Sequence, residues 1–139
     1  MVGTGIGVGR KTGLGSDDGI VTTGWVPLAE YPLRMAEIDV GVVPLEPTAF
    51  NHAKSWLKGL EFAALGVPFV ASPTDPYQDL CHSFGLGILA DGRKDWTRKL
   101  RIVVQERQQL GDDARNTVDI NDLTIERRYE SWLNAWTKW

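Results

Sequence analysis

Cysteine, histidine, long apolar runs and clustered positive charge are all scarce in this 139-residue chain. One cysteine, Cys81, excludes an internal disulfide, and with only His52 and His82 beside it the sequence predicts no metal site. No apolar run approaches the roughly 20 residues of a membrane-spanning helix. Lysine and arginine are scattered and the net charge is −3, so no basic field is present to hold a nucleic-acid backbone. We therefore expect a cytoplasmic protein with no transmembrane segment and no nucleic-acid partner.

Glycine is abundant but concentrated at one end of the chain. Seven of the fifteen glycines fall within residues 1–19, where they cost too much backbone entropy for regular structure. We predict a flexible segment over 1–19, an α/β domain over 20–111 and a tryptophan-rich carboxyl-terminal helix over 112–139. The run from Gly5 to Thr12 is similar to a phosphate-binding P-loop, but Arg10 stands where that loop has glycine before its lysine. A flexible tail is the better interpretation.

Strands and helices are predicted to alternate from residue 20 onward. Short β-branched or apolar runs bounded by glycine or proline predict strands at 20–23, 39–43, 69–71 and 87–89. Helical spacing and end signals predict helices over 28–37, from 51 or 55 to 65, from 74 or 75 to 83, from 95 to 111 and from 121 to 138. This alternation favours a parallel sheet covered by helices, which is a truncated Rossmann-like α/β domain.

The predicted helix ending at Leu65, with Gly66 as its carboxyl-terminal cap, has two different faces. One has the 3–4 spacing of a packed face and consists of Ala53, Leu57, Leu60 and Ala64. The other, about 90° away, carries Lys54, Lys58 and Glu61. The amino terminus of a helix offers unbonded N–H groups and a partial positive charge, so the amides near its start and the two lysines suit a diphosphate. A carboxylate such as Glu61 can accept two hydrogen bonds from the vicinal hydroxyls of a ribose.

Three consecutive stretches of the chain carry a recognisable pattern. They are Gly24-Trp-Val-Pro-Leu-Ala-Glu-Tyr31, Ile38-Asp-Val-Gly-Val-Val-Pro-Leu-Glu46, and the run from Phe50 to Ser72, in which Glu61 precedes an Ala-x-Gly-x-Pro-x-Val-Ala turn. In that order and spacing they resemble the carboxyl-terminal domain of GT-B glycosyltransferases, in particular the large retaining group called family 4. The resemblance is strong over residues 20–72 and weaker beyond them.

The resemblance implies the donor-binding half of an enzyme that transfers a hexose from a nucleotide-diphosphate sugar. That molecule is a substrate, so no cofactor is expected, and the acceptor would be held by another chain or by an amino-terminal domain. The expected donor site consists of Lys54, Ser55, Trp56, Lys58 and Glu61, with Glu61 on the ribose. By analogy, and because open α/β sheets bind ligands at the carboxyl ends of their strands, the expected nucleobase pocket consists of Gly24, Trp25, Pro44 and Leu45. No catalytic residue is assigned.

The sequence departs from the family pattern in two places. Ala53 occupies the position where the family usually has a glutamate that contacts the donor sugar, and the first strand and helix of the family's domain have no counterpart. A non-catalytic truncated remnant, or a binding subunit of a split glycosyltransferase, is therefore an alternative. A further alternative is an ordinary surface helix, in which Lys58 and Glu61 form an i, i+3 ion pair worth only a few tenths of a kcal/mol.

Overall fold

The computed structural model describes residues 24–137, apart from some side chains of the last helix, and the chain divides into two units. These are Met1–Ile38 and Asp39–Trp139. The glycine-rich segment predicted over 1–19 and the strand predicted at 20–23 lie outside the described residues. In the first unit, helix α1 (Tyr31–Ala36) has proline in its first turn, a position that suits the fixed φ of proline.

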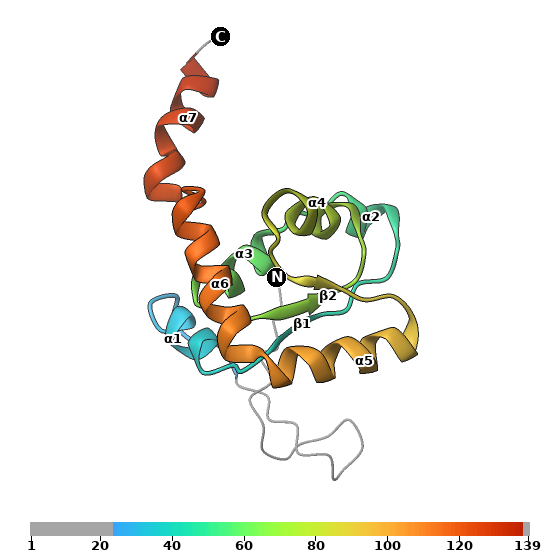
Figure 1. The fold of residues 1–139 in the computed structure, drawn as a ribbon. Coiled ribbons are helices and arrows are strands. Elements are labelled where there is room, and N and C mark those ends of the chain that lie inside the picture. Colours follow the sequence, from blue (N-terminus) through green and yellow to red (C-terminus); the bar gives the residue numbers. More distant parts are fainter. Residues whose placement is uncertain (1–23, 138–139) are drawn as a thin grey trace. The chain divides into compact units, whose positions relative to one another are not determined.

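The second unit contains a parallel sheet of three strands in the order β1-β2-β3 (Figure 1). The strands are β1 (Gly41–Val43), β2 (Phe69–Ala71) and β3 (Ile88–Leu89). Gly41 lies opposite Phe69 across the first pair, and Val70 opposite Ile88 across the second. All three were predicted from the sequence, with β1 and β3 slightly shorter than expected. Helices flank the sheet, which confirms the Rossmann-like α/β arrangement.

Each strand of the second unit is followed along the chain by one or more helices. These helices are α2 (Ala49–His52), α3 (Leu57–Ala64), α4 (Asp75–Phe84), α5 (Gly92–Gln105), α6 (Arg107–Ile120) and α7 (Ile125–Thr137). Successive side chains of β2 point to opposite faces of the sheet. Val70 packs with Val103 of α5 on one face. The Phe69 ring on the other face contacts Phe62 of α3 and Tyr77 of α4, with centroids 6.0 and 6.3 Å away.

Helix α3 buries a different face from the one that its apolar spacing predicts. Its buried residues are Gly59, Phe62 and Ala63, whereas Leu57 of the predicted packed face is 56% exposed. A Cβ on Gly59 would lie 2.8 Å from the Leu80 side chain, so this glycine allows α3 to lie close to α4. The predicted stripe was wrong because it gave no weight to a glycine that permits close packing, and because residues 53–56 break the expected helix before α3 begins.

The helix predicted from Asp95 to Gly111 is two helices. Helix α5 begins at Gly92, where the Asp95 carboxylate accepts a hydrogen bond from the backbone N–H of Asp91 at 3.1 Å, and ends at Gln105. Gly111 does not end a helix but is buried inside α6. A Cβ there would lie 2.2 Å from the carbonyl oxygen of Gly66, so the glycine permits α6 to approach the end of α3. Gly66 itself, with φ of +70°, follows α3 as predicted.

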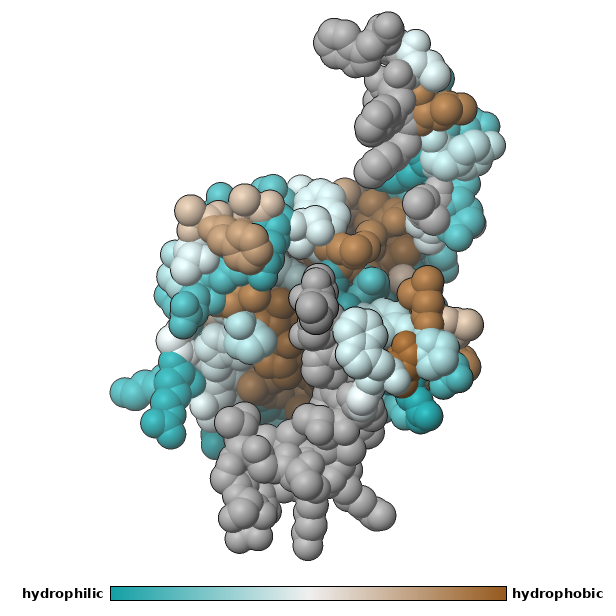
Figure 2. Space-filling model, turned by 180° about the vertical axis from the view of Figure 1, so that it is seen from behind, coloured by the Kyte–Doolittle hydropathy of each residue, from teal (hydrophilic) through white to brown (hydrophobic). Residues whose placement is uncertain are grey.

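Apolar side chains also reach the surface of the protein. Figure 2 shows brown, hydrophobic residues interspersed with teal, hydrophilic ones on the face that it presents. Val42 of β1 and Val104 of α5 are 48% and 50% exposed. Among residues 24–137, no helix has the length and apolar character needed to cross a bilayer.

Candidate functional site

The segments that follow β1 and β2 meet at the carboxyl edge of the sheet. The backbone N–H of Leu45 donates a hydrogen bond to Ser72 Oγ at 2.9 Å, which joins the two segments directly after their strands. A shallow depression of about 250 Å³ lies farther along the same segments. Its lining residues come from the end of α2, the loop before α3 and the first turns of α4, and they are His52, Lys54, Ser55, Trp56, Asp75, Pro76 and Asp79.

His52 and Asp75 form the closest polar contact within this depression. His52 Nδ1 lies 2.8 Å from Asp75 Oδ1 and 3.5 Å from the backbone nitrogen of Asp75. The first contact requires a proton on Nδ1 and the second requires a lone pair there. The contact with the carboxylate is shorter and charge-assisted, so we assign the proton to Nδ1. In the neutral ring this leaves Nε2 as a hydrogen-bond acceptor.

Three of the predicted donor-site residues line the depression together. Lys54 and Ser55 are exposed, and the Lys54 ammonium lies 4.8 Å from the centroid of the Phe50 ring, a cation–π contact. Trp56 is half-buried, and its ring stands nearly perpendicular to that of Phe84, at 87° and 6.0 Å between centroids. The depression therefore combines a cation, a hydroxyl and an aromatic ring whose orientation is fixed by packing.

The other two predicted donor-site residues contact each other on α3. Lys58 Nζ lies 2.6 Å from Glu61 Oε2, and the two side chains are 30% and 31% exposed. Neither belongs to the lining of the depression. Next to them, burial raises the pKa of the Tyr77 phenol, and the positive charge of Lys58 opposes that rise. The pair therefore lies on a half-buried part of the helix, with Lys58 in its first turn and Glu61 one turn later.

The residues predicted for the nucleobase pocket are divided between the two units of the chain. Pro44 and Leu45 follow β1 in the second unit, where Pro44 is exposed and Leu45 is half-buried. Gly24 and Trp25 belong to the first unit, and the Trp25 side chain is 87% exposed. The predicted base pocket stays a prediction.

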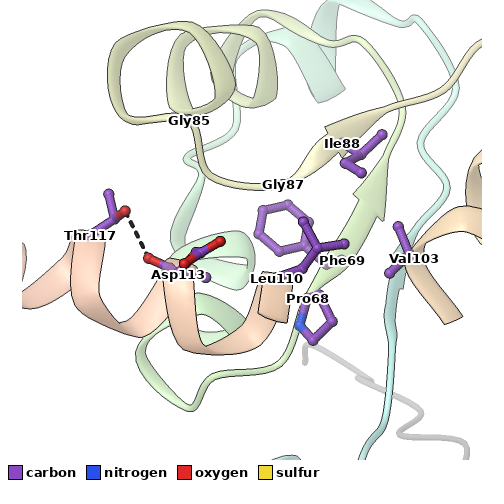
Figure 3. Close-up of a pocket in the computed structure, with 10 residues that line it drawn as sticks. Pro68, Phe69, Gly85, Gly87, Ile88, Val103, Leu110, Asp113 and Thr117 are labelled. Atoms are coloured by element: carbon purple, nitrogen blue, oxygen red, sulfur yellow. Dashed lines mark hydrogen bonds between the residues drawn. The ribbon is translucent and has the colours of Figure 1, made fainter. Parts of the chain in front are cut away.

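A second cavity lies at the opposite, amino edge of the sheet, and its walls are mostly apolar (Figure 3). It measures about 180 Å³. Figure 3 shows the ring of Phe69 among the side chains of Ile88 and Leu110. On α6, the Thr117 hydroxyl donates a hydrogen bond to the carbonyl oxygen of Asp113 at 2.8 Å, and so it does not need a ligand as partner. The remaining lining residues are Pro68, Gly85, Gly87, Val103 and Ala114.

The only cysteine has a structural environment. Cys81 is half-buried, its thiol donates a weak hydrogen bond to the carbonyl oxygen of Gly87 at 3.5 Å, and burial raises its pKa. A raised pKa keeps the sulfur in the less nucleophilic thiol form. Among the described residues, no three histidine, cysteine or acidic side chains are grouped closely enough to hold a metal ion.

The sequence did not predict His52, Asp75 and Asp79 as site residues. His52 and Asp75 are 23 positions apart, and only His52 lies within the run from Phe50 to Ser72 that carries the sequence pattern. The one signal that points to them is topological, since both closely follow the carboxyl ends of neighbouring parallel strands, where ligands bind in open α/β sheets. That rule needs the strand order, which the sequence alone did not supply.

Comparison of the chain with protein-family models, curated proteins and solved structures gave no match. The structure identifies a small α/β domain with a three-stranded parallel sheet. Any assignment of activity must therefore rest on the chemistry of the carboxyl edge and on the sequence pattern.

Proposed function

We propose that this chain binds a nucleotide-diphosphate sugar as the donor-binding half of a GT-B glycosyltransferase similar to family 4. The observation that carries the proposal is the shared position of Lys54, Ser55 and Trp56, which line one depression immediately before the amino terminus of α3. The sequence pattern that resembles the family supports it independently. In the structure β1 is followed by the short α2, by α3 and by β2, so the stretch that carries the resemblance has a helix directly before β2.

The diphosphate is assigned to the start of α3. The first-turn amides of a helix have no acceptor within the helix, and together with the helix dipole they favour an anion. Lys54 lies in the loop before this turn and Lys58 within it, so both ammonium groups supplement the amides. The cation–π contact of Lys54 with the exposed Phe50 ring contributes only about 0.5–1 kcal/mol, so a phosphate can displace it.

Glu61 is assigned to the hydroxyls of the ribose. Its Oε2 atom contacts Lys58, and a carboxylate has further lone pairs to accept hydrogen bonds from two vicinal hydroxyls. The contact with Lys58 also keeps the Glu61 carboxylate next to the place assigned to the diphosphate. Transfer of the hexose to an acceptor hydroxyl would then depend on electrostatic stabilisation of the departing diphosphate.

Isothermal titration calorimetry of the whole chain with UDP-, GDP- and ADP-sugars tests this proposal. One of the three is expected to bind. Glu61→Gln should weaken that binding by roughly 10- to 100-fold, which corresponds to about 1.5–3 kcal/mol for hydrogen bonds to a charged group. Glu106→Gln is the matched control, because Glu106 is exposed between α5 and α6 and should leave the affinity unchanged.

Lys54→Met, with Lys94→Met as the control at an exposed position of α5, tests the anion site in the same titration. The loss caused by Lys54→Met should shrink as salt is raised, because an exposed charge is screened. Absence of heat with every nucleotide sugar would remove the donor-site proposal. Binding without transfer activity, in the presence of candidate acceptors, would instead favour the non-catalytic binding subunit.

A further inference from the structure

The depression beside α3 carries more negative than positive charge. Two carboxylates, Asp75 and Asp79, line it together with one ammonium group, that of Lys54. Asp75 and Asp79 come from the first turns of α4, so they stand across the depression from the start of α3. A diphosphate placed among these carboxylates would be repelled, and the anion therefore belongs on the α3 side, away from α4.

The remaining groups suit a ligand that both donates and accepts hydrogen bonds. Asp75, Asp79 and Nε2 of His52 accept hydrogen bonds, whereas Lys54 donates them and the Ser55 hydroxyl does both. A sugar hydroxyl also does both, so a ring with several hydroxyls can satisfy these groups together. Metal binding is the competing explanation for carboxylates near a histidine, but no metal-holding group occurs within residues 24–137.

Two contacts within the protein orient side chains of the depression. The 2.8 Å contact with His52 fixes one oxygen of Asp75 and leaves that side chain 69% exposed. Packing on Phe84 fixes the ring of Trp56. An indole ring offers an apolar surface for the C–H groups of a pyranose, which polar side chains alone do not supply.

We propose that the depression is the subsite for the glycosyl group of the donor, with Asp79 and the His52–Asp75 pair recognising its hydroxyls and Trp56 contacting its ring. This inference rests on the proposed function for the position of the diphosphate. It assigns recognition of the sugar to α4, since Ala53 has no polar side chain to offer. The ligand class is a hexopyranosyl group with free hydroxyls.

Calorimetry with matched pairs of ligands tests the subsite: UDP against UDP-glucose, GDP against GDP-mannose, and ADP against ADP-glucose. In Asp79→Asn, the nucleotide sugar should lose roughly 10-fold in affinity, as expected when a charged hydrogen-bond acceptor is removed. The bare nucleotide diphosphate should bind equally well or more tightly, because a repulsive charge is gone. Asp119→Asn, at an exposed position of α6, is the matched control and should change neither affinity.

An independent measurement uses free hexoses. The indole N–H signal of Trp56, assigned with Trp56→Phe, is followed by NMR while D-glucose, D-mannose or D-galactose is added, with glycerol as the control. One hexose should shift this signal in the wild-type protein and shift it less in Asp79→Asn. A hexose shift without any nucleotide binding would remove the proposed function and retain the subsite.

Two results would overturn the subsite. The first is equal weakening of nucleotide and nucleotide-sugar binding in Asp79→Asn, which would place Asp79 near the nucleotide instead. The second is a Trp56 signal that responds to no hexose, together with a nucleotide-sugar affinity that Asp79→Asn leaves unchanged. Thermal unfolding of each variant, followed by circular dichroism, tests whether the fold is retained.

Discussion

The two edges of the same parallel sheet are built from different chemistry. The amino edge, where Phe69 begins β2 and Gly87 directly precedes β3, has a mostly apolar cavity and close contacts that only glycine permits. The carboxyl edge has a shallow depression lined by histidine, lysine, serine and aspartate. The contrast teaches that close packing of apolar side chains and glycines shapes the amino edge, whereas the carboxyl edge keeps polar groups at the surface. Such groups are expected where a ligand binds.

The largest expected difference in stability is between two alanine variants, one of an aromatic residue at the amino edge and one of a leucine at the start of α3. Phe69 is 2% exposed, so Phe69→Ala should lower the free energy of unfolding by about 3–5 kcal/mol. Leu57 is 56% exposed, and Leu57→Ala should change it by less than about 0.5 kcal/mol. Urea denaturation measures both. Equal losses of unfolding free energy in the two variants would mean that Leu57 is packed, as the sequence predicted for α3.

Alanine variants of two glycines at the amino edge distinguish the effect of close packing from that of backbone strain. Gly87 and Gly85 both have positive φ, +82° and +68°, so alanine is strained at either position. Only at Gly87 does the added Cβ meet another residue, the Phe69 ring at 2.3 Å. Gly87→Ala should therefore destabilise the protein by about 1–3 kcal/mol more than Gly85→Ala in the same denaturation assay. Equal effects would mean that the Phe69 ring moves aside without loss.

At the carboxyl edge we expect a polar-to-apolar change to stabilise the protein. Thr74 is 1% exposed, and its Oγ1 has no hydrogen-bond partner in the described part of the chain. Thr74→Val keeps the shape and removes the buried hydroxyl, so the free energy of unfolding should rise by about 1 kcal/mol. Thr97→Val is the control. Its exposed hydroxyl donates a hydrogen bond to the Arg93 carbonyl oxygen, so its removal should not raise the free energy of unfolding. A loss of stability in Thr74→Val would show that the hydroxyl has a partner in solution.

The smallest expected effect depends on pH and concerns the start of α5. A hydrogen bond from Arg98, with further contacts from the Asp91 backbone and Lys99, holds the pKa of Asp95 well below its usual range. A lowered folded-state pKa stabilises the protein above the unfolded value of about 4, and this contribution is lost as pH falls toward the folded pKa. Asp95→Asn should lower Tm at pH 7, and the difference from wild type should shrink below about pH 4. A difference independent of pH would contradict this.

Local patterns predicted the elements of this chain better than their packing. Strand β2 was predicted with its observed bounds, and Gly66 was identified as the residue after α3, because both depend on backbone preferences within a few residues. Gly111 was misassigned as a helix end. Glycine ends many helices, but here it allows α6 to approach the carbonyl oxygen of Gly66, a contact between distant parts of the sequence.

The candidate site was predictable in part for the same reason. Three predicted donor-site residues are consecutive in the sequence, so one local pattern predicted them together. These residues, Lys54, Ser55 and Trp56, line one depression. Asp75 and Asp79 were missed because they reach it from a different helix. The ion pair of Lys58 and Glu61, which the sequence offered as the feature of an ordinary surface helix, is present on α3, whereas the position of the pair outside the depression needed the structure.

The sequence by itself determined the class of fold, since β-branched runs, helix caps and turn residues act within a few positions of one another. It also determined the net charge of −3, because a net charge follows from composition and does not depend on folding. Only the tertiary structure decided which face of α3 is buried and which side chains share the carboxyl edge. Those facts depend on the order of parallel strands and on close glycine contacts, which join residues far apart in the chain.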